Sequence, residues 1–233
     1  MNLKKFHQII LDWSPYLVLA FFYQNIHYLA DFWQIKSFDW LLTAIDRWLF
    51  WGQLPTLMIQ SWNNYWLTEW FSLIYLLYLP LLIVAPLYFY LHNKQLYRKI
   101  TILICLTSII GLTGYIILPA VGPDSYLSDK FIQSIIGGPI FKLENFIISL
   151  VRAPRDTFPS MHVAHTAVIL FFCWRRKRFI FWWLLPFVLS VWLSTMYLRY
   201  HYFIDVLSGV AVALLAYWLY LKLIQNVNIK NKN

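Results

Sequence analysis

The sequence predicts an all-α membrane protein, a polytopic bundle of six transmembrane helices with interfacial helices on its outer face. Of its 233 residues, 61% are hydrophobic, 20% are aromatic and 12% are charged, which is too apolar for an ordinary soluble domain. Several apolar runs approach the roughly 20 residues with which a helix crosses the hydrocarbon core of a bilayer. Because these runs use nearly the whole chain, we expect residues 1–233 to form a single integral membrane domain.

The six predicted spans follow one another along the chain. The residues before the first span carry Lys4 and Lys5 and are expected to be a retained cytoplasmic start, because no small-residue cleavage site follows their apolar run. Pro80 and Pro86 are expected as kinks in the second span, since neighbouring helices can satisfy the carbonyl groups that proline leaves free. The predicted spans are residues 15–30, 66–90, 100–118, 160–174, 179–197 and 203–223.

Residues 37–64 are expected to form interfacial helices on the outer side. They mix four tryptophans with acidic and basic residues, which is typical of helices that lie along a membrane surface. The break at residues 52–55 divides them. The alternative is a deeper position for residues 41–50, which would bury the adjacent charges of Asp46 and Arg47 at a high cost.

The longest predicted insert between two spans is residues 119–159. It is rich in glycine, proline and charged residues, and a break at residues 137–139 precedes an apolar run. This pattern predicts a short amphipathic helix at residues 140–151. Cys105 and Cys173 lie in apolar runs, so we expect neither a disulfide nor a cysteine metal site.

The distribution of basic residues predicts the orientation. If both termini are cytoplasmic, the inner segments hold 12 of the 19 basic residues and the outer segments hold 7, as expected when Lys and Arg are concentrated inside. The net charge of +9 then follows from topology and inner-leaflet attraction, and no nucleic-acid partner is expected. We expect a bacterial inner (plasma) membrane location. The inner basic residues are Lys4, Lys5, Lys94, Arg98, Lys99, Arg175, Arg176, Lys177, Arg178, Lys222, Lys230 and Lys232.

A histidine and an aspartate precede the last apolar run at a spacing of four residues. At this spacing His201 and Asp205 are expected to share one helix face, so that the carboxylate binds one ring nitrogen and leaves the other free as a nucleophile or base. Ionisable groups at the membrane edge are costly, which favours a functional role. The alternative is a polar helix start whose residues only cap and anchor it.

A second candidate segment opens the fourth span. Ser160 is expected to cap this helix, which puts His162 in its first turn. A helix start with free N–H groups favours anions, and Arg152 and Arg155 add forked donors suited to phosphate oxygens. A plain helix cap beside interfacial arginines is the alternative. Because the predicted topology puts this segment and His201 on the same side, the two together predict a phosphate-binding site at the outer surface.

These motifs also resemble those of a known family. Pro159-Ser-Met-His162 is similar to the Pro-Ser-x-His motif of the type 2 phosphatidic acid phosphatase superfamily, and Ser194 followed by His201 and Asp205 resembles its last motif. Residues 119–123 and 46–56 resemble a subgroup related to inositol phosphorylceramide synthases.

The resemblance implies a role for each residue of the site. His201 attacks phosphorus to give a phosphohistidine, Asp205 orients His201, and His162 protonates the leaving oxygen. No metal and no other cofactor are implied. His165, in the same helix as His162, is expected to have a structural or supporting role.

The sequence departs from the family pattern at the phosphate-binding arginines. Thr195 stands where an arginine is expected directly after the motif serine, and the first motif of the Lys-x6-Arg-Pro type is missing. The expected substitutes are Arg199, Arg155 and Arg152, together with Ser160.

The sequence therefore predicts a membrane lipid-phosphate phosphatase that acts on a phosphate ester or diphosphate of a lipid. A lipid head-group phosphotransferase is the alternative, because it begins with the same intermediate. A non-enzymatic haem or transport protein is a weaker alternative, since haem needs facing histidines at depth and transport needs polar groups along the spans. The expected partners are a lipid phosphate and membrane lipids; neither the lipid nor the oligomeric state follows from the sequence.

Overall fold

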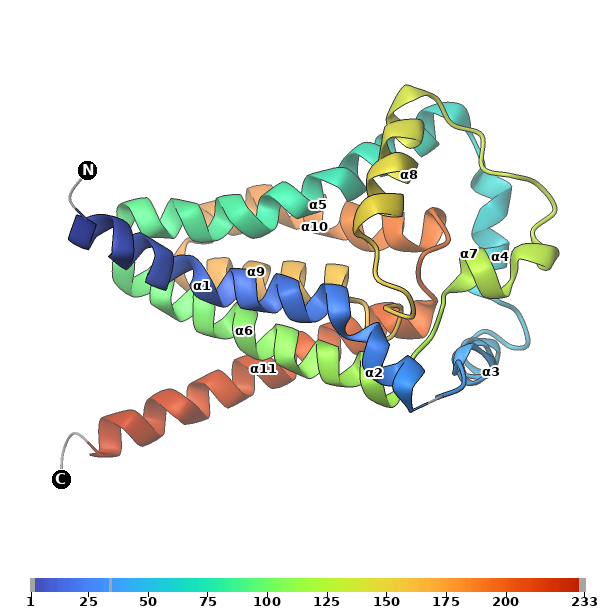
Figure 1. Cartoon of the computed structure of the whole chain (residues 1–233). Coiled ribbons are helices and arrows are strands. Elements are labelled where there is room, and N and C mark those ends of the chain that lie inside the picture. The colour runs from blue at the N-terminus through green and yellow to red at the C-terminus, as the bar shows by residue number, and fades with distance from the viewer. Residues whose placement is uncertain (1–2, 34, 231–233) are drawn as a thin grey trace.

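Long helices run side by side and connect at the two ends of the molecule (Figure 1). The computed structural model describes residues 3–33 and 35–230, and within them it contains helices and no strand. Residues 1–2 of the predicted cytoplasmic start and Lys232, one of the predicted inner basic residues, lie outside these residues. The α-helices are α1 Leu3–Asn25, α2 His27–Phe32, α3 Asp39–Leu49, α4 Pro55–Met58, α5 Tyr65–His92, α6 Lys94–Ile117, α7 Pro123–Tyr126, α8 Pro139–Val151, α9 Met161–Arg176, α10 Arg178–Tyr197 and α11 Phe203–Lys230.

Four of the described helices, α5, α6, α10 and α11, are long and apolar enough to cross a membrane. They indicate an integral membrane protein and correspond to four of the six predicted spans. The other two, α1 and α9, are not among the four, so the count of six spans stays a prediction. At 16 residues, α9 is shorter than the roughly 20 residues of a typical span.

Helix α9 lies at the centre of the bundle, where it contacts α5, α6, α10 and α11. Val163, Ala164, Ala167 and Val168 on this helix have no exposed surface. Small residues allow such close packing between helices, and Gly209 of α11 is one of them, because a Cβ there would lie 2.6 Å from Ser160 O. Packing of α9 on four neighbours therefore fixes the position of the histidines in its first two turns.

The predicted first span, residues 15–30, was wrong in its bounds. Helix α1 begins at Leu3, continues through Pro15 and ends at Asn25, where a break separates it from α2. Proline usually interrupts a helix because it leaves the carbonyl four residues earlier without a partner. Here the Ser14 hydroxyl donates to that carbonyl, Leu11 O, at 2.9 Å. The helix therefore continues through the proline.

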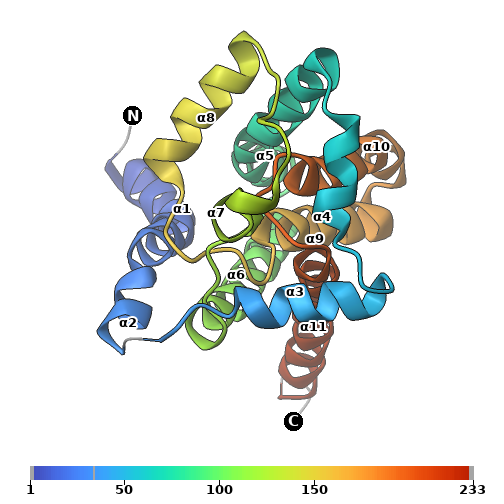
Figure 2. The same cartoon turned by 90° about the vertical axis from the view of Figure 1, so that its right-hand side faces the viewer.

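The two ends of the bundle differ. Both termini lie at one end, whereas α3, α4, α7 and α8 lie at the other (Figures 1 and 2). The predicted helix at residues 140–151 is confirmed as α8, and the break at residues 52–55 separates α3 from α4. The side chain of Glu69 on α5 accepts the N–H groups of Gly138, Ile140 and Phe141 at 2.8–3.0 Å, which fixes the start of α8. Whether these helices lie along a membrane surface stays a prediction.

Candidate active site

His201 lies in the short loop before α11, so the predicted shared helix face of His201 and Asp205 was wrong. Helix α10 ends at Tyr197, and its end is closed by the N–H groups of Tyr200 and His201, which both donate to Thr195 O. His201 Nδ1 lies 3.4 Å from Asp205 Oδ2, and the same oxygen accepts the Tyr202 N–H at 2.8 Å. The turn at the start of α11, rather than a helix face, brings the pair together.

The second ring nitrogen of His201 faces His162. His201 Nε2 lies 3.4 Å from His162 Nδ1. His162 is in the first turn of α9, and Ser160 caps this helix by accepting the Val163 N–H at 3.5 Å, as predicted. The His162 ring packs between Tyr75 and Tyr78, at centroid distances of 4.6 and 4.4 Å. Two histidines from distant parts of the chain are thus held with their nitrogens facing one another.

The environment of His201 keeps its ring uncharged. The side chain is almost fully buried, and this burial, together with the positive charge of Arg152, lowers the pKa of His201 to about 3. A neutral imidazole has a free lone pair at one nitrogen. When the Nδ1 proton is held by Asp205, this lone pair is at Nε2, on the side of His162.

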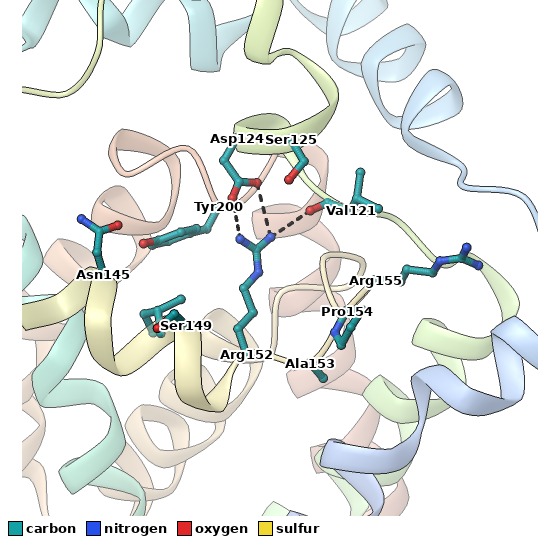
Figure 3. A pocket seen from close by; sticks show the side chains of 11 residues that line it. Val121, Asp124, Ser125, Asn145, Ser149, Arg152, Ala153, Pro154, Arg155 and Tyr200 are labelled. Carbon is teal, nitrogen blue, oxygen red and sulfur yellow. Dashed lines mark hydrogen bonds and ion pairs between the residues drawn. The ribbon is translucent and has the colours of Figure 1, made fainter.

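Arg152 is the predicted arginine that lies beside the histidines. It follows α8 and donates to Asp124 Oδ2 at 2.6 Å and to Val121 O at 2.8 Å (Figure 3). It also donates to Asp156 Oδ1 at 3.5 Å. Burial alone would lower the pKa of Arg152, but the Asp124 carboxylate outweighs burial and the net direction is upward. The guanidinium also lies 5.2 Å from the Tyr200 ring. Arg152 is therefore a fixed positive charge next to the His201 loop.

The other two predicted arginines have different partners. Arg155 donates to Ile35 O at 2.8 Å and pairs with Asp31 at 3.3 Å, and its side chain is directed away from Arg152 in Figure 3. Arg199 adopts a positive φ of 68°, donates to Gln133 O at 2.8 Å and covers the Phe131 ring. Arg199 is absent from the described residues that line the two cavities below. Arg199 therefore lies outside both cavities although it is only two residues before His201 in the sequence.

Two cavities meet at Arg152. A largely apolar cavity of about 920 Å³ extends between α1, α5, α6 and α9 and reaches His162 and His201. A more polar pocket of about 440 Å³ lies beside α7 and α8 (Figure 3). Arg152, Tyr200 and Ile148 line both cavities. The polar groups of the smaller pocket are Asp124, Ser125, Asn145, Ser149, Arg152, Arg155 and Tyr200.

Two aspartates that the sequence motifs do not indicate also support this region. Asp46 accepts the N–H groups of Phe203 and Ile204 at 2.9 Å and so caps α11. Asp39 accepts the N–H groups of Val121 and Gly122 and the Tyr202 hydroxyl. A usable signal existed, because Asp39, Leu42, Thr43 and Asp46 recur at helical spacing and all four are buried on one face of α3.

The family resemblance of the two histidine motifs is tested by comparison with known proteins. The sequence pattern of the PAP2 superfamily matches residues 40–219, which include both histidine motifs. The chain belongs to the PAP2 superfamily. This superfamily includes lipid phosphatases and phosphotransferases. The inositol phosphorylceramide synthase of Candida albicans (strain SC5314) is 41% identical over 58 residues, which cover 24% of this chain and 12% of that protein. No solved structure matches the chain.

Proposed function

We propose that this PAP2 superfamily protein removes phosphate from a phosphate ester or diphosphate of a lipid, with His201 as the nucleophile. The observation that carries the proposal is the 3.4 Å approach of His201 Nε2 to His162 Nδ1 beside the fixed charge of Arg152. A buried neutral histidine that faces a second histidine has the arrangement that a nucleophile and a general acid need.

The proposed reaction has two steps. In the first, His201 Nε2 attacks phosphorus while Asp205 holds the other nitrogen, and the bond from phosphorus to the lipid oxygen breaks. A bound phosphate anion stabilises the protonated form of His162, which gives its proton to the leaving oxygen. In the second, His162 takes a proton from water, the oxygen of that water attacks phosphorus, and inorganic phosphate leaves a free His201.

The surroundings of the histidines suit a lipid phosphate. The apolar cavity that ends at His162 and His201 fits a hydrocarbon chain, whereas Arg152 supplies a positive charge that attracts phosphate oxygens. Because Arg152 is held by Asp124 and Val121, little side-chain entropy is lost when phosphate binds. We therefore assign phosphate binding to Arg152, with Ser160 as the cap that fixes His162, and not to Arg199 or Arg155.

A head-group phosphotransferase is the second candidate, and two observations favour it. One is the similarity to an inositol phosphorylceramide synthase. The other is the polar pocket beside Arg152, where Asp124, Ser125 and Asn145 could bind the hydroxyl groups of an alcohol. Transfer would begin with the same phosphohistidine, and the alcohol would replace water in the second step.

We also propose the location of the site. Both termini lie at the end of the bundle opposite α3, α7 and α8 (Figure 1), which fits cytoplasmic termini and an active site on the outer face of a bacterial inner membrane. We infer that the whole chain works as one membrane domain that needs no metal.

An assay of a panel of lipid phosphates with purified protein tests this function. The assay is run with a chelator, with and without an added alcohol acceptor, and with His201→Ala as the control variant. Release of inorganic phosphate without acceptor, absent in the variant, supports hydrolysis. If no lipid phosphate yields inorganic phosphate but a head group moves onto added ceramide, diacylglycerol or inositol, the transferase replaces the phosphatase.

A further inference from the structure

Three polar side chains from three helices form a hydrogen-bonded chain inside the apolar cavity. The His165 ring of α9 has Tyr78 of α5 on one side, with the hydroxyl 2.9 Å from Nδ1, and Ser108 of α6 on the other, with the hydroxyl 2.8 Å from Nε2. All three side chains line the cavity that ends at His162 and His201. None of them takes part in the proposed transfer of phosphate.

The hydrogen-bonded side chains of Tyr78, His165 and Ser108 lie about one helical turn further into the cavity than His162. His165 follows His162 by three residues, which is about 4.5 Å along an α-helix. The remaining lining around it is largely hydrocarbon and aromatic, as at Leu79, Leu82 and Ile104. Polar and ionisable groups in such surroundings are costly, and those that occur commonly contact a substrate. A substrate whose phosphorus lies at His201 and whose chain enters the cavity would pass this position.

Counting hydrogens shows that Ser108 has bonding capacity left over. If the Tyr78 hydroxyl donates to Nδ1, the Nε2 proton is given to Ser108 Oγ, and the Ser108 proton remains free. If Ser108 instead donates to Nε2, then Nδ1–H donates to the Tyr78 oxygen, and the Tyr78 hydroxyl can donate to Met161 O at 3.3 Å. In this case Ser108 Oγ can accept a further hydrogen bond. Ser108 can therefore donate or accept as its partner requires, and a hydroxyl group is the partner that can also do both.

We propose that Ser108, positioned by His165 and Tyr78, binds a hydroxyl group of the lipid a few bonds from the phosphate ester. The site thereby selects lipids with such a hydroxyl over lipids with plain hydrocarbon at this position. This inference rests on the proposed function, because that function sets the phosphorus at His201. A purely structural role, in which the three side chains only hold α5, α6 and α9 together, would affect all lipids equally.

Binding of two matched lipid phosphonates to the purified protein in detergent micelles tests the proposal. The two probes have the same chain and the same phosphonate, and only one carries a hydroxyl on the second or third carbon from phosphorus. Because one hydrogen bond differs, the wild type should bind the hydroxylated probe about threefold to tenfold more tightly. Ser108→Ala should bind both probes equally, at the affinity of the plain one.

Thr107→Val is the matched control. Thr107 is the buried neighbour of Ser108 on α6, its hydroxyl donates to Leu103 O at 2.8 Å, and it is not among the residues that line the cavity. This variant should keep the preference. The proposal would be overturned if the wild type bound both probes equally or bound neither of them. It would also be overturned if the preference survived Ser108→Ala, or if that variant bound both probes more weakly by the same factor. Since binding needs no turnover, a failure of the proposed catalysis is detected separately, as activity that persists in His201→Ala.

Discussion

The carboxylate of Asp46 accepts the backbone N–H of Phe203 at 2.9 Å, and its other oxygen accepts the N–H of Ile204 at the same distance. These are N–H groups that the start of α11 leaves without helical partners. Asp46 is fully buried, and this burial raises its pKa to about 6. Helix α3 is thereby attached to the turn that carries Asp205, directly after His201.

Removing this cap should weaken both stability and activity. Asp46→Ala leaves the two N–H groups without a partner and should cost about 0.5–2 kcal/mol of unfolding free energy. Phosphate release should fall as well, because the start of α11 positions Asp205. Asp46→Asn, which keeps one acceptor oxygen, should lose less. Thermal unfolding in detergent and a phosphate assay measure both effects, with exposed Asp129→Ala as the control; wild-type behaviour of Asp46→Ala would contradict the capping role.

The effect of replacing His162 should depend on the leaving group of the substrate. If His162 protonates the leaving oxygen, His162→Ala should reduce turnover of an alkyl phosphate lipid by about 10²–10⁴-fold. The reduction should be much smaller for a lipid analogue with an acidic phenol as leaving group, which departs without a proton. Steady-state rates on the two substrates give the comparison. An equal loss on both would indicate that His162 only binds phosphate.

The buried carboxyl group of Glu144 should make the stability of the protein depend on pH. It is fully buried on α8, one oxygen accepts the Tyr200 hydroxyl at 2.7 Å, and burial raises its pKa from 4.5 to about 7. The folded protein therefore holds this proton more tightly than the unfolded chain. Its contribution is fully present below pH 4.5 and is lost as pH rises through 7.

Comparison with Glu144→Gln isolates this contribution. The glutamine keeps an oxygen that accepts from Tyr200 but does not titrate. Between pH 4.5 and 8 the wild type should lose about 2–3 kcal/mol of stability relative to the variant. Chemical unfolding in detergent at several pH values measures the difference. Parallel pH profiles of the two proteins would show that Glu144 does not ionise in this range.

Most of the long helices could be predicted because a local pattern encodes each of them. The apolar runs gave α5, α6, α10 and α11, and the serine before Met161 gave the start of α9. The limits of α1 could not be found in this way, because the Ser14 hydroxyl compensates for Pro15, and this compensation is a detail of side-chain geometry rather than of hydropathy.

The site could be predicted only in part. The sequence indicated His162, His201 and Asp205, because each of them belongs to a short motif that can be read locally. It did not separate Arg152 from Arg199, because a positive φ at Arg199 and the partner at Gln133 arise from the folded loops. Nor could the polar pocket be predicted, since α7, α8 and the His201 loop, which form it, are distant in sequence.

Accessibility of introduced cysteines tests the proposed topology. In a protein whose Cys105 and Cys173 are replaced by alanine, Ser125→Cys should react with an impermeant thiol reagent added to intact cells. Lys177→Cys follows the end of α9 that is remote from His162, and it should react only after the membrane is opened. Labelling of the Lys177 variant alone would invert the orientation and assign the site to inner-leaflet lipids.

Trapping of the covalent intermediate addresses the role of His201 itself. The wild-type protein is mixed briefly with a lipid phosphate that carries radioactive phosphorus, quenched in alkali and digested. The label should be found on the peptide that contains His201, should be absent from His201→Ala, which should also have lost turnover, and should be much reduced in Asp205→Asn. Label on another peptide, or turnover that persists in His201→Ala, would contradict His201 as the nucleophile.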